Sequence, residues 1–246
     1  MATESRGRVR VEQGSKRVRT YLGGELIADT VQPRLVWEGP SYPTYYFPEA
    51  DVRMELLSPS SRVERSPSRG EAHYLSVKGG DRVVEDAAWH YPQSPLEELR
   101  GLIRFEWEAM DAWFEEDEEV FVHPRSPYTR IDILSSSRRV QVLVGDTVVA
   151  DSHQPRILFE TGLSPRYYLP LTDVRLDLLR PSESTSRCPY KGTASYWSLE
   201  LDGEVFPDLV WTYKTPLRES INIAGLVSFY DERVDLVVDG VRQGGA

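Results

Sequence analysis

The sequence carries one pattern twice, at an offset of 122 residues that holds without a gap for most of each copy. The longest matching segments are Arg17–Asp29 with Arg139–Asp151, and Tyr45–Arg53 with Tyr167–Arg175. Only the last part of the copy needs a shift of two residues, which sets Gly101 against Gly225. Each copy is close to the usual size of a domain with its own core, so the repeat predicts two related domains rather than one larger domain.

Composition narrows the class of protein. The chain has 246 residues, 40% of them hydrophobic, and a formal net charge of −10. Nucleic acid and anionic membranes both require clustered positive charge, so we expect neither as a partner. The basic start of the chain, with Arg6, Arg8 and Arg10, alternates with valines and is interpreted as the solvent face of strands. No apolar run approaches the ~18 residues of a membrane helix, and the N-terminus lacks a hydrophobic signal core, which predicts a cytoplasmic protein.

Cofactor and metal motifs are missing from the sequence. Cys188 is the only cysteine, which excludes an internal disulfide and a cysteine-rich zinc site. The four histidines are scattered and show no ligand spacing, and there is no phosphate-binding loop, dinucleotide fingerprint or Gly-x-Ser-x-Gly motif. We therefore expect neither a metal nor a cofactor.

Short apolar stretches separated by turn residues predict an all-β fold. In the second copy, Val140–Val144 and Val148–Ala150 flank a Gly-Asp turn that is typical of an antiparallel hairpin, and the first copy repeats this spacing. We place the two domains at residues 1–119 and 120–246. The acidic run Glu115–Glu119 is interpreted as a solvated hinge at the end of the first domain.

Two segments need a comparison of the copies. Leu102–Trp107 is predicted to be a strand, because its counterpart in the second copy is β-like, and a short helix is predicted around Ala109–Phe114. Asp173–Leu179 alternates between polar and apolar residues, which predicts another strand. On that strand Arg175 would stand between two carboxylates and face water. The alternative is that this arginine faces a cleft and holds an acidic ligand.

An ordered set of motifs resembles a known family. The motifs are Cys188-Pro-Tyr-Lys-Gly192, Ala194-x-Tyr196-Trp197, Trp211-x-Tyr213 and Phe229-Tyr230. With them the chain resembles the domain of unknown function 427 family, in its tandem bacterial form. The resemblance implies two homologous, small antiparallel β-tent domains, which we expect to pack as a pseudo-two-fold pair. A nucleotidyl-transfer label attached to the family gains no support from the residues, because a phosphate loop and a convincing pair of metal-binding carboxylates are both missing.

The segment Arg187–Gly192 brings a nucleophile, a cation and a phenol together. Positive charge from Lys191 would favour the reactive thiolate of Cys188, and the proline and glycine would turn the side chains towards a cleft. The alternative is a small buried thiol beside a turn, with Lys191 in solvent. The first copy has Ser66–Gly70 at this place, which keeps the turn residues and a positive charge but lacks the thiol and the phenol. We therefore expect the second domain to be the working copy and the first to be altered.

Aromatic side chains are the second candidate feature. Trp211 and Tyr213 lie on the same face of one predicted strand because side chains alternate along a strand, and Tyr168 is expected nearby. Such rings suit a pocket for a flat or cationic ligand. The alternative is that they fill the core between two sheets.

The leading functional hypothesis is a module that binds an unidentified small molecule in its second domain, as a monomer or a homodimer. The residues assigned to the site are Tyr168, Cys188, Tyr190, Lys191, Tyr196, Trp211 and Tyr213. Lys191 would pair with an anionic group while the rings pack on an apolar or flat part. Two other classes stay open: an enzyme with transferase-like or thiol chemistry at Cys188 and Lys191, and a scaffold that binds a protein through exposed strands and the acidic hinge.

Overall fold

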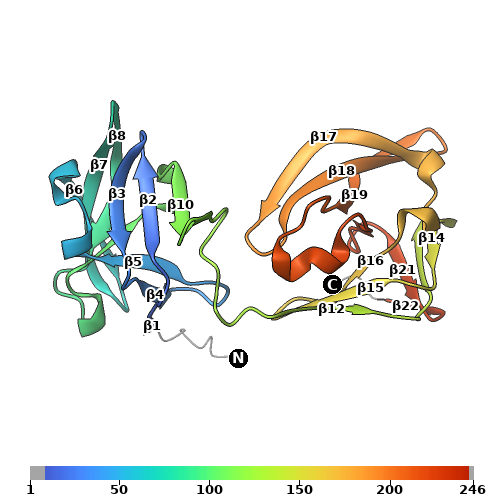
Figure 1. Cartoon of the computed structure of the whole chain (residues 1–246), viewed down its shortest axis with the longest axis horizontal. Coiled ribbons are helices and arrows are strands. Elements are labelled where there is room, and N and C mark those ends of the chain that lie inside the picture. Colours follow the sequence, from blue (N-terminus) through green and yellow to red (C-terminus); the bar gives the residue numbers. More distant parts are fainter. Residues whose placement is uncertain (1–8, 244–246) are drawn as a thin grey trace. The chain divides into compact units, whose positions relative to one another are not determined.

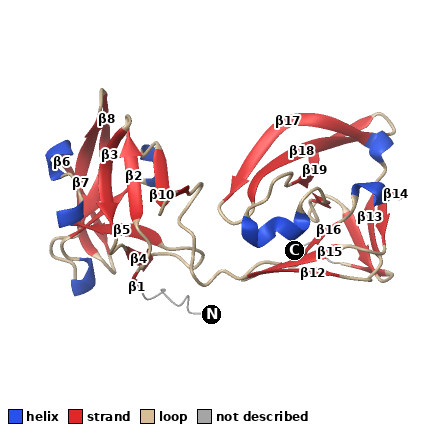
Figure 2. Ribbon diagram, in the orientation of Figure 1, coloured by secondary structure: helices blue, strands red, loops and turns tan. Residues whose placement is uncertain are grey.

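The computed structural model describes residues 9–243, so Arg6 and Arg8 lie outside the described residues. The chain forms two compact units, Met1–Ser126 (unit 1) and Pro127–Ala246 (unit 2), each drawn in Figure 1. Both consist of antiparallel strands and short 3-10 turns (Figure 2), which confirms the predicted all-β fold. Within residues 9–243, no helix has the length and apolar character needed to cross a membrane.

Unit 1 contains two sheets. The larger has seven strands in the order β1-β4-β5-β9-β8-β7-β6, and the smaller has four in the order β11-β10-β2-β3. All neighbouring strands pair antiparallel. In chain order the strands are β1 (Arg10–Gln13), β2 (Val18–Leu22), β3 (Glu25–Thr30), β4 (Arg34–Trp37), β5 (Thr44–Pro48), β6 (Leu57–Ser66), β7 (Gly70–Gly79), β8 (Arg82–His90), β9 (Leu102–Phe105), β10 (Ala112–Glu115) and β11 (Glu118–Glu119).

Unit 2 has the same strand sequence, with the large sheet divided. Its sheets have the orders β12-β15-β16, β14-β13-β21-β22 and β17-β18-β19-β20. The strands are β12 (Ile131–Ser135), β13 (Val140–Val144), β14 (Thr147–Ser152), β15 (Arg156–Glu160), β16 (Arg166–Tyr168), β17 (Leu179–Cys188), β18 (Gly192–Leu201), β19 (Glu204–Thr212), β20 (Val227–Phe229), β21 (Asp235–Val238) and β22 (Val241–Arg242). Reciprocal backbone hydrogen bonds of 2.7 and 2.9 Å join Leu169 to Val227. They link the end of β16 to β20 where unit 1 has the β5–β9 pairing.

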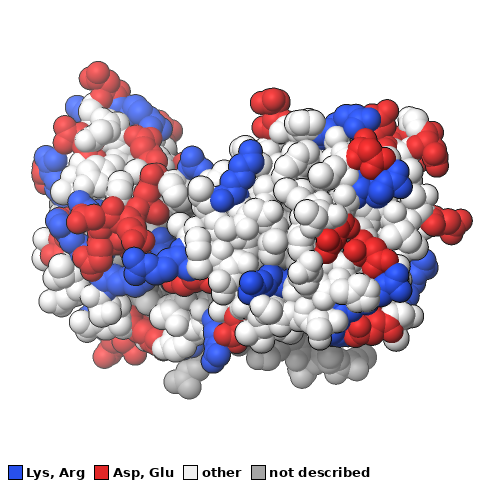
Figure 3. All heavy atoms as spheres, turned by 45° about the vertical axis from the view of Figure 1, so that its right-hand side comes forward, with Lys and Arg blue, Asp and Glu red and all other residues white. Residues whose placement is uncertain are grey.

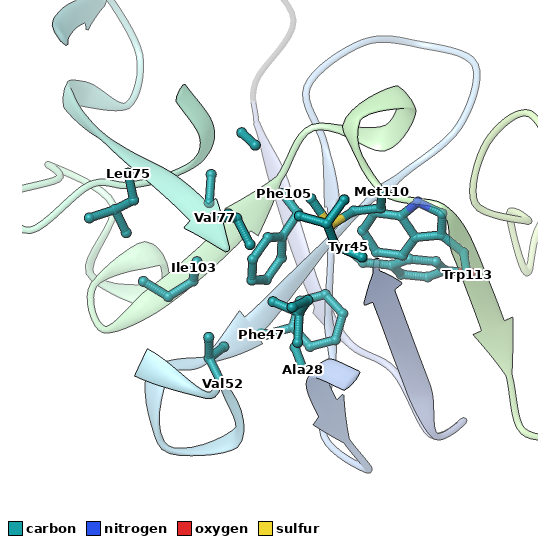
Figure 4. Packing of buried hydrophobic residues seen from close by; sticks show 14 of the residues in the cluster. Ala28, Tyr45, Phe47, Val52, Leu75, Val77, Ile103, Phe105, Met110 and Trp113 are labelled. Atoms are coloured by element: carbon teal, nitrogen blue, oxygen red, sulfur yellow. The ribbon is translucent and has the colours of Figure 1, made fainter. Parts of the chain in front are cut away.

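Each unit buries two separate hydrophobic clusters. In unit 1 the first cluster lies between the sheets, where the rings of Phe47, Phe105 and Trp113 gather (Figure 4). The second cluster lies on the other face of the large sheet. Tyr45 and Tyr46 are both buried because side chains alternate along β5, so that Tyr45 enters the first cluster and Tyr46 the second. The matching second cluster of unit 2 contains Tyr168, Trp211 and Tyr213, with Tyr196 packed against it.

The prediction for the end of unit 1 was right for the strand and wrong for the helix. Leu102–Phe105 is strand β9, as expected. The segment Ala109–Phe114 is not helical: a 3-10 turn at Trp107–Ala109 leads into β10, which pairs with β2. Strand geometry buries Trp113 in the first cluster, where only 3% of it is exposed, so tertiary packing overrides the local helical preference.

Asp173–Leu179 is not a strand either. Two 3-10 turns, Leu171–Asp173 and Leu176–Leu178, flank Val174, which forms an isolated bridge to Ala150. The alternation of polar and apolar residues is compatible with these turns as well as with a strand. Val174 is buried at the bridge, while its polar neighbour Asp173 is half-buried and Arg175 is exposed. Arg175 is exposed and pairs with Asp177 at 2.6 Å. The water-facing interpretation of this arginine therefore holds, and the cleft-facing alternative is wrong.

The acidic run Glu115–Glu119 belongs to unit 1 and is not a hinge: its last four residues are exposed, as expected, but Glu115 is buried. Glu115 is only 6% exposed, and it accepts hydrogen bonds from the Tyr45 hydroxyl (2.5 Å) and the Lys16 ammonium (2.6 Å). Glu118–Glu119 forms β11, which pairs with β10. A buried carboxylate is tolerated here because two donors replace the water that it loses.

Surface charges are mixed in sign and partly repeated between the copies. On the face drawn in Figure 3, acidic and basic side chains are interspersed within each unit. Arg17 pairs with Asp29, and the equivalent Arg139 pairs with Asp151 at 2.5 Å. The guanidinium hydrogen bond lowers the pKa of each of these aspartates below its ordinary value. The repeat in sequence is thus also a repeat in side-chain contacts.

Candidate functional site

The predicted site residues come from three neighbouring parts of unit 2. Tyr168 ends β16, Tyr196 lies on β18, and Trp211 lies on β19 directly opposite Tyr196. Tyr213 follows the end of β19. The turn between β17 and β18 carries Lys191, because Cys188 pairs with Gly192 at the closing end of that hairpin. Opposite residues of an antiparallel pair project from the same face, so the hairpin and the two strands turn these side chains towards one place.

Five of these residues line one cavity of about 390 Å³. They are Tyr168, Lys191, Tyr196, Trp211 and Tyr213. The remaining lining residues are Leu158, Glu160, Leu163, Ser164, Arg166, Tyr230 and Glu232. The cavity therefore has aromatic walls and a few charged groups, most of them on β15, β16 and the segment after β20.

Cys188 and Tyr190 do not line this cavity. Cys188 is half-buried and packs against the second hydrophobic cluster, with its Sγ 3.9 Å from the Lys191 Nζ. Tyr190 is 9% exposed, and its carbonyl oxygen accepts a hydrogen bond of 3.3 Å from the hydroxyl of Ser220. The structure therefore separates the predicted set into five residues that face the cavity and two that pack beside it.

A buried ion pair forms one end of the cavity. The Lys191 ammonium donates to the carboxylate of Glu160, with side chains only 12% and 8% exposed. Lys191 is thus neither in solvent nor unpaired. Sequence reasoning missed Glu160, although a usable signal was present: Glu38 stands at the same place in the first copy, and Arg69 at the place of Lys191 forms an ion pair with it at 3.2 Å.

Tyrosine hydroxyls and one indole make up the wall. The Trp211 ring lies 4.6 Å from that of Tyr230, centroid to centroid, and the Tyr230 hydroxyl is 3.4 Å from that of Tyr196. Burial, followed by the contact with Tyr196, raises the pKa of Tyr230 to about 12. Burial also raises the pKa values of Tyr168 and Tyr213 well above the ordinary value, so these two phenols and that of Tyr230 are neutral near pH 7. They act as hydrogen-bonding groups and not as charged ones.

Arg166 stands at the other side of the cavity. Its guanidinium lies 5.4 Å from the centre of the Trp211 ring and pairs with Asp231 at 2.9 Å and Glu232 at 3.6 Å. Burial raises the pKa of Asp231, against the opposing effect of Arg166. Comparison of the copies could not point to this arginine, because the first copy has Thr44 at the place of Arg166.

The described residues contain no metal-binding cluster. Within residues 9–243, no group of three or more histidine, cysteine, aspartate or glutamate side chains is arranged to hold a metal ion. The cavity instead combines ion-paired carboxylates and cations, which can form hydrogen bonds, with aromatic rings, on which a flat group can stack.

The comparison with known families agrees with the motifs. The family described as "Domain of unknown function (DUF427)" matches the chain twice, at residues 10–116 and at residues 132–240. One match falls in each compact unit, and together they cover most of the chain. A search of curated proteins finds no match. The description of the family names no activity.

Proposed function

The chain belongs to the DUF427 family in a tandem form, and we propose that it is a small-molecule-binding module whose site is the cavity of unit 2. The observation that supports this most is the grouping of five side chains from β16, the β17–β18 hairpin and the end of β19 around one space of about 390 Å³. Small-molecule sites typically measure ~300–1,000 Å³ and combine apolar or aromatic walls with a few placed polar groups.

The polar groups suggest how a ligand would be oriented. Tyr213 is only 7% exposed and lines the cavity, so its hydroxyl is a candidate partner for a ligand atom. A ligand atom that forms a hydrogen bond with this hydroxyl would take the place of water, and the direction of that bond would orient the ligand in the cavity. Lys191 is engaged by Glu160, so we assign the two residues together, rather than Lys191 alone, to the polar end of the site.

The matched tryptophans of the two copies provide a test. We expect a ligand found in a metabolite screen to raise the unfolding temperature of unit 2, because ligand at 100 times its Kd adds about 2.7 kcal/mol to stability. Trp211→Leu removes the central ring of the wall and should abolish most of this ligand-induced shift. The control is Trp89→Leu, the equivalent change in unit 1, which should leave the shift intact.

Each variant is compared with its own ligand-free transition, because both indoles are largely buried and both changes destabilise the chain. If Trp89→Leu abolished the ligand-induced shift and Trp211→Leu retained it, the site would lie in unit 1, and the assignment to unit 2 would be wrong. If no small molecule raises the unfolding temperature and pull-downs with the chain return one protein reproducibly, the result supports the scaffold hypothesis instead.

The enzyme hypothesis has one contact in its favour, the 3.9 Å between Cys188 Sγ and Lys191 Nζ. The ammonium, however, already faces the Glu160 carboxylate, so it offers a thiolate little unmatched positive charge. We expect Cys188 to react with a thiol probe at pH 7 no faster than an ordinary half-buried cysteine, and Cys188→Ser to leave ligand binding unchanged. Rapid, selective labelling of Cys188 would favour thiol chemistry.

A further inference from the structure

The place in unit 1 that corresponds to the cavity is occupied by an arginine of the chain itself. Arg104 on β9 stands opposite Trp89 on β8, and its guanidinium lies 4.3 Å from the centre of the Trp89 ring. The same guanidinium donates to the carboxylate of Glu38. Arg104 thus stacks on the indole and pairs with the carboxylate at the same time, and its side chain is only 18% exposed.

Unit 2 keeps the two partners of this arginine but not the arginine. Trp211 corresponds to Trp89 and Glu160 to Glu38. The residue opposite Trp211 is Ser228 on β20, in the register that Arg104 has in unit 1. With serine in place of this long cation, no arginine joins Trp211 to Glu160. Arg166 lies 5.4 Å from the centre of the Trp211 ring, but it pairs with Asp231 and Glu232.

Two polar groups of unit 2 have unused hydrogen-bonding capacity near the place that Arg104 holds in unit 1. The Ser228 hydroxyl is fully buried and has no hydrogen-bond partner within the described chain. It projects from the same face of the sheet as Trp211, which lines the cavity. Buried polar groups without partners are uncommon and call for an explanation.

The second group is Glu160. In unit 1 the equivalent Glu38 accepts hydrogen bonds from Tyr46 (2.5 Å) and Arg104, and it also forms an ion pair with Arg69. Glu160 accepts only from Lys191 within residues 9–243. A carboxylate has roughly four acceptor positions, so Glu160 retains capacity for further donors.

The charges around the cavity point the same way. Counting lining residues and their direct ion-pair partners, the cations are Lys191 and Arg166, and the carboxylates are Glu160, Asp231 and Glu232. This leaves one negative charge unmatched. Both cations already face carboxylates, so an added anion would have to displace a paired group, whereas an added cation would complete the set.

We infer that the cavity of unit 2 accepts a planar cation with N–H donors, a guanidinium or amidinium group of a small molecule, in the position that the Arg104 side chain holds in unit 1. The group stacks on Trp211 and donates to Glu160, which both line the cavity. Stacking of a planar cation on an indole combined with a carboxylate partner is the recognition that guanidinium geometry favours. This inference depends on the proposed function, because it specifies the ligand class of that same cavity.

The test uses three probes of equal shape and different charge: benzamidine, benzamide and benzoate, titrated calorimetrically into the full chain. We expect benzamidine to bind at least tenfold more tightly than benzamide, and benzoate to bind more weakly than both. The filled variant Arg166→Thr/Ser228→Arg installs in unit 2 the residues that unit 1 has at these places. It should fold, since unit 1 accommodates the same arrangement, and it should lose benzamidine binding.

A converse variant gives an independent readout. Arg104→Ser empties the corresponding place in unit 1, and it should raise the benzamidine stoichiometry from one to two per chain. Benzamidine binding that survives in the filled variant, or no benzamidine binding at all, would overturn the inference. Benzoate or benzamide binding as tightly as benzamidine, and lost in the filled variant, would overturn the ligand class while leaving the proposed site in place. The proposed function fails separately, if no compound of any charge is sensitive to Trp211→Leu.

Discussion

Replacing Gly79 with alanine is expected to lower the free energy of unfolding of unit 1 by about 3 kcal/mol. A Cβ atom at Gly79 would lie 2.1 Å from the carbonyl oxygen of Leu22 and 2.9 Å from the Leu22 Cβ. Backbone atoms cannot swing aside as the tip of a long side chain can. The ends of β2 and β7 would therefore have to separate, and both strands carry buried residues of the first cluster. Chemical denaturation of the full chain measures the loss.

Gly39→Ala is the matched control for this prediction. A Cβ atom there meets nothing within 4 Å, so the free energy of unfolding should change by less than about 0.5 kcal/mol. Unit 2 has Leu201 at the place of Gly79, and that leucine packs partly buried against the first cluster of its own unit. The close backbone approach is therefore particular to unit 1. Equal losses of unfolding free energy in Gly79→Ala and Gly39→Ala would show that the backbones at Gly79 and Leu22 do not lie this close together.

Lys191→Met is expected to destabilise unit 2 by about 3 kcal/mol, because it leaves the Glu160 carboxylate buried and without its only partner in the described chain. Methionine keeps most of the length of the lysine stem, so the loss reports the charge rather than a cavity. The double variant Glu160→Gln/Lys191→Met removes both charges and should recover most of the lost stability. Denaturant titration of the two variants measures the difference.

The exposed pair of Arg139 and Asp151 is the control for the buried one. Both side chains are well exposed, and surface ion pairs contribute only about 0–1 kcal/mol, so Arg139→Met should have a small effect. A loss in Lys191→Met no larger than that in Arg139→Met would contradict the burial of the Glu160–Lys191 pair. Because Lys191 also supports the fold, its substitution alone does not distinguish lost ligand contacts from lost stability. Trp211→Leu has a matched control in Trp89→Leu, which is buried to a similar degree.

Because the sequence repeats, the two copies could be compared, and this comparison predicted the all-β fold and the two related domains. Comparison of the copies predicted β9 correctly, because the equivalent residues of the second copy are rich in β-favouring types. It failed at Asp173–Leu179, where the alternating pattern that predicts a strand is produced equally by two 3-10 turns around one bridged residue. It also failed at Glu115, whose burial depends on donors from Tyr45 and Lys16, both distant in the chain.

The candidate site was only partly readable from the sequence. Alternation along strands brought Trp211 and Tyr213 together, and both line the cavity. Tyr190 was grouped with them by sequence proximity alone, but its side chain lies outside the lining. Glu160 and Arg166 were missed because they belong to β15 and β16, and only the folded sheet carries them to the hairpin. The exchange of Arg104 for Ser228 was hidden by the two-residue shift between the copies and becomes visible through strand register.

The most direct test of a ligand site in unit 2 is an NMR titration of the full chain, observing the indole N–H signals of its six tryptophans with the compound found in the screen. Signals are assigned with the Trp89→Leu and Trp211→Leu variants. We expect the Trp211 signal to move in proportion to occupancy, because the ligand lies against that ring, while the Trp89 signal stays in place beneath Arg104. A moving Trp89 signal with a stationary Trp211 signal would contradict a ligand site in unit 2.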